Sequence, residues 1–242
     1  MAHTDTPSYR LRQSQCSVDI DRARLLRGDC FPTDHQPDEF DQECQHILIE
    51  DQRSDQLVCT FRYKVFSTGA ALDGAYAAQF YGLENLWRFK QPMLEIGRFC
   101  VAEGMGDPTI LRLAWAHIGG IVDRENIGIL FGCSSFDGID VGKYAQSFAL
   151  LQRRYLAPDQ WRLGIKAPEV FHLNPAQLPQ QLEPAVAQRD LPPLLRSYLT
   201  MGGWVSDHAV IDRQMNTLHV FTGLEVASVP PARRRFLRAD PN

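Results

Sequence analysis

The sequence predicts an α/β fold in which helices flank a mixed central sheet. Two strand patterns, at 46–50 and 57–66, are joined by a polar turn, and a third apolar strand follows at 93–101. A helix with clear boundaries then leads into a buried strand at 129–136. Because strands come first and then alternate with helices, we expect one large sheet covered by helices.

Length and composition are those of one large domain. The chain has 242 residues, of which 44% are hydrophobic and 22% are charged, ordinary proportions for a globular protein. We expect a flexible arm over residues 1–17 and a single domain over 18–242, with a C-terminal extension from about residue 161. The net charge of -4 provides no general attraction to nucleic acid.

Several features are typical of a cytoplasmic protein. The six cysteines are scattered without a Cys-x-x-Cys pair, so we expect reduced thiols and no metal site. Residues 1–15 lack the apolar core of a standard signal peptide, and no apolar run reaches the length of a membrane span. An arginine cluster at 233–238 suits anionic lipid headgroups or an acidic partner protein, and a solvated terminus is the alternative.

The other elements follow from apolar spacing and from breakers. A helical spacing of apolar residues predicts a first helix at 18–31, ended by the prolines that follow it. The helix after the third strand begins at Asp107, which can cap it, with Pro108 in the first turn. In the C-terminal half we expect, in order, a helix at 141–156, a strand at 170–173, a helix at 194–201 and strands around 204–211 and 218–226.

The strand at 93–101 carries two charged side chains, which a buried strand normally excludes. Glu95 and Arg98 lie three residues apart, so a regular strand would turn them to opposite faces. Gly97 between them permits a bulge that would bring both toward one cleft. Glu95 would then take a proton from an attacking amine, and Arg98 would hold the substrate or orient Glu95. A structural ion pair at a strand edge is the alternative.

A glycine loop follows this strand and opens the next helix. Gly104 and Gly106 expose backbone amides just before Asp107, and amides at a helix start bind a pyrophosphate or phosphopantetheine phosphate. An ordinary turn into a helix is the alternative. A charged pair beside such a loop is typical of acyl-transferring enzymes. Cys133, inside the apolar strand at 129–136, is expected to pack rather than to act as a nucleophile.

Four motifs occur in the order of one family. They are Phe40-Asp41-x-x-Cys44-x-His46, Cys59-Thr60-Phe61-Arg62-Tyr63, Glu95-Ile96-Gly97-Arg98-x-Cys100-Val101 and Phe131-Gly132-Cys133-Ser134-Ser135-Phe136. From about residue 18 to its end the chain resembles the N-acyltransferases that make lyso-ornithine lipid, within the GCN5-related N-acetyltransferase (GNAT) superfamily. The resemblance extends to Leu191-Pro192-Pro193-Leu194-Leu195. It implies the GNAT fold, whose central strands splay.

The resemblance also implies a reaction. A 3-hydroxyacyl chain would pass from acyl carrier protein to the α-amino group of ornithine, giving lyso-ornithine lipid. No tightly bound cofactor is implied, because the donor is the acyl-phosphopantetheine of the carrier. Glutamine as the acceptor stays open, as does contact with an anionic membrane. The rival functions are an acyl-homoserine lactone synthase, which the long segment after Trp161 disfavours, and a non-catalytic module that binds acyl carrier protein.

Individual side chains receive roles from the same resemblance. Glu95 and Arg98 would be the catalytic pair, and Gly104, Gly106 and Asp107 would contact the phosphopantetheine. The loop lacks the arginine that is common in phosphate loops of the superfamily. The expected substrate-binding residues are Arg27, Phe31, Asp41, Arg62, Cys133 and Ser134.

Overall fold

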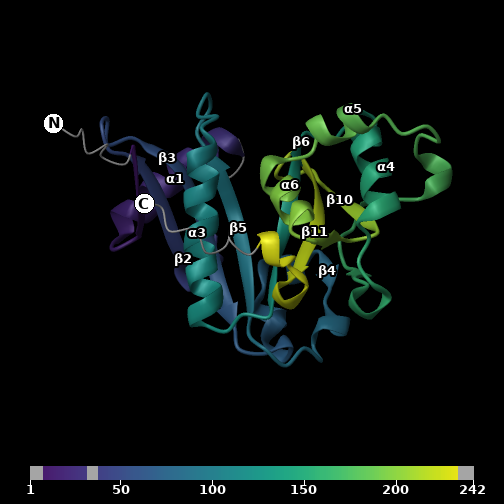
Figure 1. The fold of residues 1–242 in the computed structure, drawn as a ribbon, viewed down its shortest axis with the longest axis horizontal. Coiled ribbons are helices and arrows are strands. Elements are labelled where there is room, and N and C mark those ends of the chain that lie inside the picture. The colour runs from purple at the N-terminus through teal and green to yellow at the C-terminus, as the bar shows by residue number, and fades with distance from the viewer. Residues whose placement is uncertain (1–7, 32–37, 234–242) are drawn as a thin grey trace.

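The protein has an α/β fold, as the sequence predicts. A computed structural model describes residues 8–31 and 38–233, and within them a nine-stranded sheet has helices on both faces (Figure 1). The strand order is β1-β2-β3-β5-β6-β11-β10-β8, and the short β9 pairs with β11. The arginines from 234 to 238 lie outside the described residues.

The N-terminal half of the sheet is antiparallel. Its strands are β1 (Tyr9–Gln13), β2 (Gln45–Asp51), β3 (Leu57–Phe66) and β5 (Met93–Val101). The predictions for β2, β3 and β5 are confirmed. The prediction of a flexible arm over 1–17 is wrong for β1, because Tyr9 to Gln13 pair with Asp51 to Ile47 at the sheet edge.

Three helices accompany this half. They are α1 (Ser17–Cys30), α2 (Phe40–Glu43) and α3 (Pro108–Arg124). The start of α3 is as predicted, since the Asp107 carboxylate accepts a hydrogen bond from the Thr109 amide at 2.8 Å and Pro108 occupies the first turn. α3 then connects β5 to the parallel strand β6 (Ile129–Asp137).

The C-terminal third completes the main sheet, so it is not an extension of it. β11 (Thr217–Glu225) pairs with β6 along its whole length, and β10 (His208–Asp212) and β8 (Val170–His172) follow. The expected strand at 204–211 is split into β9 (Trp204–Val205) and β10. The helices are α4 (Ala145–Arg154), α5 (Pro184–Arg189), which was not predicted, and α6 (Pro193–Thr200).

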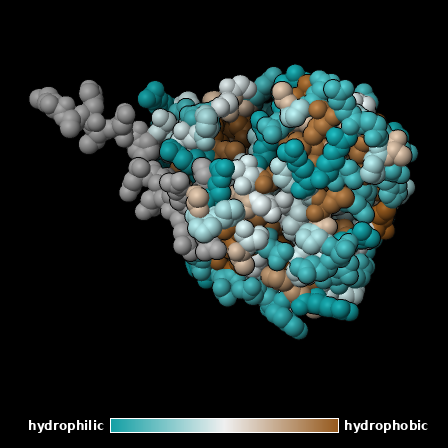
Figure 2. Space-filling model, turned by 45° about the vertical axis from the view of Figure 1, so that its right-hand side comes forward, coloured by the Kyte–Doolittle hydropathy of each residue, from teal (hydrophilic) through white to brown (hydrophobic). Residues whose placement is uncertain are grey.

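Apolar packing covers both faces of the sheet. α3 and α6 pack on one face, where Leu94 and Ile96 of β5 meet Ile118 of α3. On the opposite face the segment 66–89 packs on the sheet through short turns and the two-stranded pair β4 (Tyr81–Gly82) and β7 (Gly164–Ile165). The face in Figure 2 is mostly hydrophilic, with hydrophobic residues gathered in a hollow near its top.

The contact between β5 and β6 ends abruptly. Three residue pairs, from Met93↔Ile129 to Glu95↔Phe131, form the parallel ladder. At the next position the strands touch without room for a side chain, because a Cβ on Gly132 would lie 2.2 Å from the carbonyl oxygen of Ile96. Beyond this point the two strands diverge and their facing edges line a cavity.

We therefore expect Gly132→Ala to lower the free energy of unfolding by about 1–3 kcal/mol, since the added methyl group must push backbone apart. Denaturant unfolding measures this. Gly120→Ala is the matched control, because a Cβ there meets nothing within 4 Å, and alanine inside α3 should stabilise by about 1 kcal/mol or less. Equal stability of the Gly132→Ala variant and the parent would contradict the close contact.

Candidate active site

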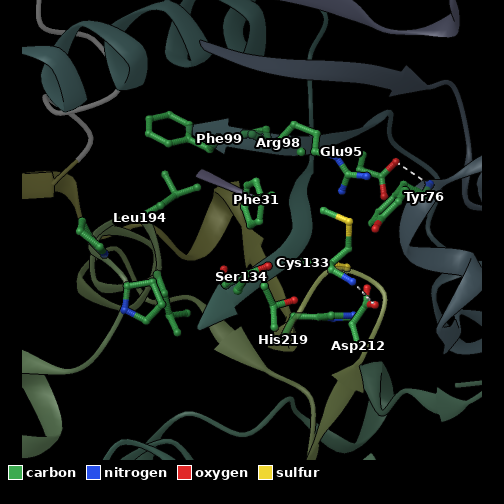
Figure 3. Close-up of a pocket in the computed structure, with 18 of the residues that line it drawn as sticks. Phe31, Tyr76, Glu95, Arg98, Phe99, Cys133, Ser134, Leu194, Asp212 and His219 are labelled. Carbon is green, nitrogen blue, oxygen red and sulfur yellow. Dashed lines mark hydrogen bonds between the residues drawn. The ribbon is translucent and has the colours of Figure 1, made fainter. Parts of the chain in front are cut away.

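A cavity of about 350 Å³ lies between the diverging parts of β5 and β6. Its walls have two characters (Figure 3). Phe99, Leu194 and the neighbouring prolines form an apolar side, while Glu95 and Tyr76 lie on a polar side. The full set that lines the cavity also includes Phe31, residues 96–98, Val101, residues 133–135, Pro192, Pro193, Leu195, Asp212, Met215, Thr217 and His219.

A bulge in β5 brings Glu95 and Arg98 to this one cavity. Opposite β3, the pairs Thr60↔Cys100 and Arg62↔Gly97 leave one extra residue in β5. The prediction that both side chains reach one cleft is confirmed. The residue of the bulge that adopts the left-handed conformation is Arg98, with φ 52°, and not Gly97. This conformation costs about 1–2 kcal/mol for a residue other than glycine, and such strain is common at functional sites.

Glu95 is held at the polar side by backbone amides. The amides of Tyr76 and Ala77, at the start of the turn η2 (Tyr76–Gln79), donate to its two carboxylate oxygens at 2.9 and 2.8 Å. The residue is 5% exposed. Burial raises the pKa of Glu95, and the two amides only partly oppose this shift. A carboxylate with a raised pKa is a stronger base than an ordinary one.

A buried ion-pair network leads from α1 to Arg98. Arg27 donates to both carboxylate oxygens of Asp41 at 2.6 and 3.0 Å. Arg62 bonds to Asp41 at 2.7 Å and to both oxygens of Asp38 at 2.6 and 2.9 Å. Asp38 in turn accepts from Arg98 at 3.3 Å, and the Arg98 guanidinium lies 4.7 Å from the centre of the Tyr76 ring.

The network changes the interpretation of three predicted residues. Arg27, Asp41 and Arg62 are 1%, 5% and 3% exposed and do not line the cavity. Burial would raise the pKa of Asp41, but Arg27 and Arg62 together lower it to about 2. The prediction that these three side chains contact the substrate directly is wrong for this structure, because their charged groups already bind one another. They are placed to position Asp38 and, through it, Arg98.

The remaining predicted substrate residues reach the cavity. Phe31, at the end of α1, lies on its wall with Cys133 and Ser134 of β6. Burial raises the pKa of the Cys133 thiol well above its usual value, which keeps it protonated and weakly nucleophilic. The Ser134 hydroxyl accepts a hydrogen bond from Thr222 at 2.9 Å.

The glycine loop lies beyond the cavity wall. Gly104 has φ 77°, so it requires the conformational freedom of glycine. Neither Gly104, Gly106 nor Asp107 lines the cavity, whose last residue on β5 is Val101. The Asp107 carboxylate already occupies one amide of the helix start. Binding of a phosphate by this loop therefore stays a prediction. The hydrogen bonds to the phosphate would have to be donated by backbone amides other than that of Thr109.

Sequence inspection missed three residues of the polar side. Tyr76 lies in a segment that looks small and flexible, and Asp212 and His219 lie on late strands without a motif. A second cavity of about 290 Å³ shares Tyr76, Arg98 and Asp212 with the first and adds Asp38 and Glu39. The one signal in the sequence is the alternation of side-chain direction along β10 and β11, which places Asp212 and His219 on the same face of the sheet.

His219 is fixed in one tautomer. The Tyr81 hydroxyl donates to the backbone oxygen of His219 at 2.9 Å and lies 3.0 Å from its Nδ1. Because a phenol has one hydrogen, Nδ1 must carry the proton and Nε2 must be a bare acceptor. Nε2 has no hydrogen-bond partner in the described part of the chain. Burial, with smaller contributions from Arg98 and His208, lowers the pKa of His219 to about 3.

Neither a metal site nor a spanning helix is found in the described ranges, 8–31 and 38–233. No group of three or more His, Cys, Asp or Glu side chains there is placed to hold a metal ion. No helix there is both long enough and apolar enough to cross a membrane.

Comparison with known proteins agrees with the geometry. The model of the acetyltransferase (GNAT) domain matches residues 28–116. An aminoglycoside 6'-N-acetyltransferase solved in complex with coenzyme A superposes with a TM-score of 0.50 at 11% identity, over 91% of this chain and 98% of that chain. The protein has the GNAT fold and is an acyltransferase, so it takes an acyl donor and an acceptor.

The names of the chain's curated relatives describe a more specific reaction than the name of the matching domain does. An L-ornithine N(alpha)-acyltransferase of Rhodobacter capsulatus is 27% identical over 247 residues, covering 95% of this chain and 94% of that protein. An enzyme of the same name from Brucella abortus is 28% identical over 214 residues, covering 85% and 75%. The chain is thus similar to L-ornithine N(alpha)-acyltransferases over most of its length.

We expect His219 to remain neutral, as the Nδ1–H tautomer, from alkaline pH down to about pH 4. Nitrogen-15 NMR of the imidazoles measures this, and His219→Gln assigns the signal by removing it. Since the pKa is lower in the folded protein than in the unfolded chain, the unfolded chain binds more protons between about pH 6.5 and pH 3. Stability from this group is therefore lost as the pH falls through that window. Titration of His219 near pH 6.5 would contradict its burial.

Proposed function

We propose that the protein transfers a 3-hydroxyacyl chain from acyl carrier protein to the α-amino group of ornithine. The product is lyso-ornithine lipid, and a second acyltransferase would complete the lipid. The observation that supports this most is the cavity between β5 and β6, whose apolar side suits a fatty chain and whose polar side suits an amino acid. The names of the curated relatives support ornithine as the acceptor.

The donor thioester is proposed to lie in the gap between the strands. The acyl chain then contacts the apolar wall of Phe99, Leu194 and Pro193. Past Glu95 the β5–β6 ladder has ended, so backbone amides on this edge of β5 can stabilise the oxyanion that forms on the thioester carbonyl. The phosphopantetheine would run past Val101 toward Gly104 and Gly106, which precede α3.

The chemical step is proposed to be direct. An amino acid is mostly an ammonium ion near pH 7, and an ammonium has no lone pair with which to attack. Glu95, directly or through water, takes the proton, and the neutral nitrogen attacks the carbonyl carbon. After the attack the nitrogen gives up a second proton, which passes directly or through water to the sulfur. The carbon–sulfur bond breaks, the carrier leaves as its free thiol, and Glu95 releases the first proton to solvent. Cys133 forms no covalent intermediate, consistent with its raised pKa.

Arg98 is proposed to hold the acceptor carboxylate. Its guanidinium lines both cavities, and it is fixed on Tyr76 and on Asp38 at the end of the ion-pair network. A guanidinium matches the two oxygens of a carboxylate. Arg27, Asp41 and Arg62 then serve the reaction by keeping Asp38 in place. Asp212 and Glu39 line the second cavity on the same polar side and give it a negative charge that suits a second ammonium group.

Glu95→Gln keeps the shape of the side chain and removes the base, so we expect kcat to fall by about 10² to 10⁴. The KM for the acyl donor should change little. Since burial raises the pKa of Glu95, the parent enzyme should gain activity as the pH rises through that raised value, and the variant should lack this limb. Purified Glu95→Gln protein with parental turnover would refute the assignment of the base.

The acceptor is identified by expressing the gene with a matched second acyltransferase in a host that lacks aminolipids. Mass spectrometry of the lipids then distinguishes an ornithine headgroup, which we expect, from a glutamine headgroup. A catalytically dead Glu95→Gln copy is the control. A glutamine lipid would contradict ornithine as the acceptor but support the proposed acyl transfer to an amino acid. The absence of any new aminolipid would count against the whole proposal.

A further inference from the structure

A groove on the outer surface lies between α3 and α6. It has a volume of about 350 Å³, and a neighbouring hollow of about 360 Å³ shares several of its residues and extends it to the start of α3. The floor is apolar, with Leu111 and Trp115 from α3 and Met201 after α6. Trp115 packs edge-on against Tyr198 of α6, with ring centres 5.1 Å apart, which holds the two helices together.

The rim of this groove is positively charged. Arg196 lines the groove and Arg112 lines its extension, and both are exposed. Neither side chain forms an ion pair or a hydrogen bond with any residue in the described ranges 8–31 and 38–233. Among the residues that the structure describes, no acidic side chain lines either part of the groove. Arg112 is close enough to Asp107 to contribute to the lowered pKa of that carboxyl group, but it forms no ion pair with it. Both guanidinium groups can therefore still bind carboxylates of another molecule.

The groove adjoins the reaction cavity. Pro193 lines both of them, and the next residue, Leu194, forms part of the apolar cavity wall. The extension reaches Pro108 and Thr109, directly after the glycine loop. A molecule seated in the groove thus lies beside the cavity wall formed by the start of α6 and beside the glycine loop.

We propose that this α3–α6 groove docks an acidic, amphipathic helix of the acyl carrier protein. The inference rests on the proposed function, which requires a carrier beside the cavity. The apolar floor fits the apolar stripe of such a helix, and Arg112 and Arg196 fit the acidic side chains that border the stripe. Docking by charge at the rim chiefly speeds association and gives it a dependence on salt.

Charge reversal separates docking from chemistry. Arg112→Glu and Arg196→Glu are assayed with acyl carrier protein as the donor and, separately, with the acyl thioester of N-acetylcysteamine, which has no protein surface. We expect kcat/KM for the carrier donor to fall about tenfold or more in each variant, with the salt dependence reduced. Activity with the small thioester should be unchanged. Arg88→Glu is the matched control, because Arg88 is also exposed but lies before β5, at the end of that strand opposite the groove's extension.

Two results would overturn docking of the carrier in this groove while leaving the proposed function intact. The first is parental activity of both variants with the carrier donor, and the second is an equal loss of activity with both donors. If the parent protein transferred an acyl chain from neither thioester, the proposed function would fail. Calorimetric titration with holo-acyl carrier protein would then test docking in the groove independently of catalysis. Binding by the parent that is weakened in both arginine variants, and not in Arg88→Glu, supports it. Loss of binding to anionic lipid vesicles with carrier binding unchanged would assign the groove to the membrane and overturn it.

Discussion

The short parallel contact between β5 and β6 is the constraint on which the site depends. Three residue pairs hold the strands together, and Gly132 then brings the backbones so close that no side chain fits between them. Each strand keeps its antiparallel partner on the other side, β3 for β5 and β11 for β6. The sheet therefore stays continuous as a whole while its centre opens, and the opening leaves backbone edges that a thioester can pair with.

The charged side chains near this opening are buried, so each needs a partner that stabilises its charge. Glu95, Arg27, Asp41 and Arg62 would each be costly alone in the interior. The two carboxylates have different partners. Asp41 binds two guanidinium groups, which lower its pKa to about 2. Glu95 accepts hydrogen bonds from two neutral backbone amides, with weaker effects from the Arg62 and Lys64 charges, and burial still raises its pKa. One acid is thus locked as a structural anion, and the other is left able to exchange a proton. This division suits a site with one base and one fixed cationic anchor at Arg98.

Sequence patterns predicted the local elements well and the long-range contacts poorly. β3 and β5 have the predicted bounds because apolar runs and flanking polar residues define them, and the Asp107 cap was found from its spacing alone. β1 was missed because its five residues sit in a polar segment and become a strand only by pairing with β2. The site residues on β5 were found from their charge. Arg27 and Arg62 were assigned to the substrate because no sequence pattern shows that their partners are Asp41 and Asp38.

We propose that the thioester carbonyl lies between the diverging strands. A crystal structure with a bisubstrate analogue, an acyl-pantetheine joined through its acyl carbon to the α-nitrogen of ornithine, tests it directly. We expect the joining carbon between Gly97 and Cys133, the acyl chain against Phe99 and Leu194, and the nitrogen within reach of Glu95. An analogue bound elsewhere on the protein, or strands paired across the gap with the ligand excluded, would contradict it.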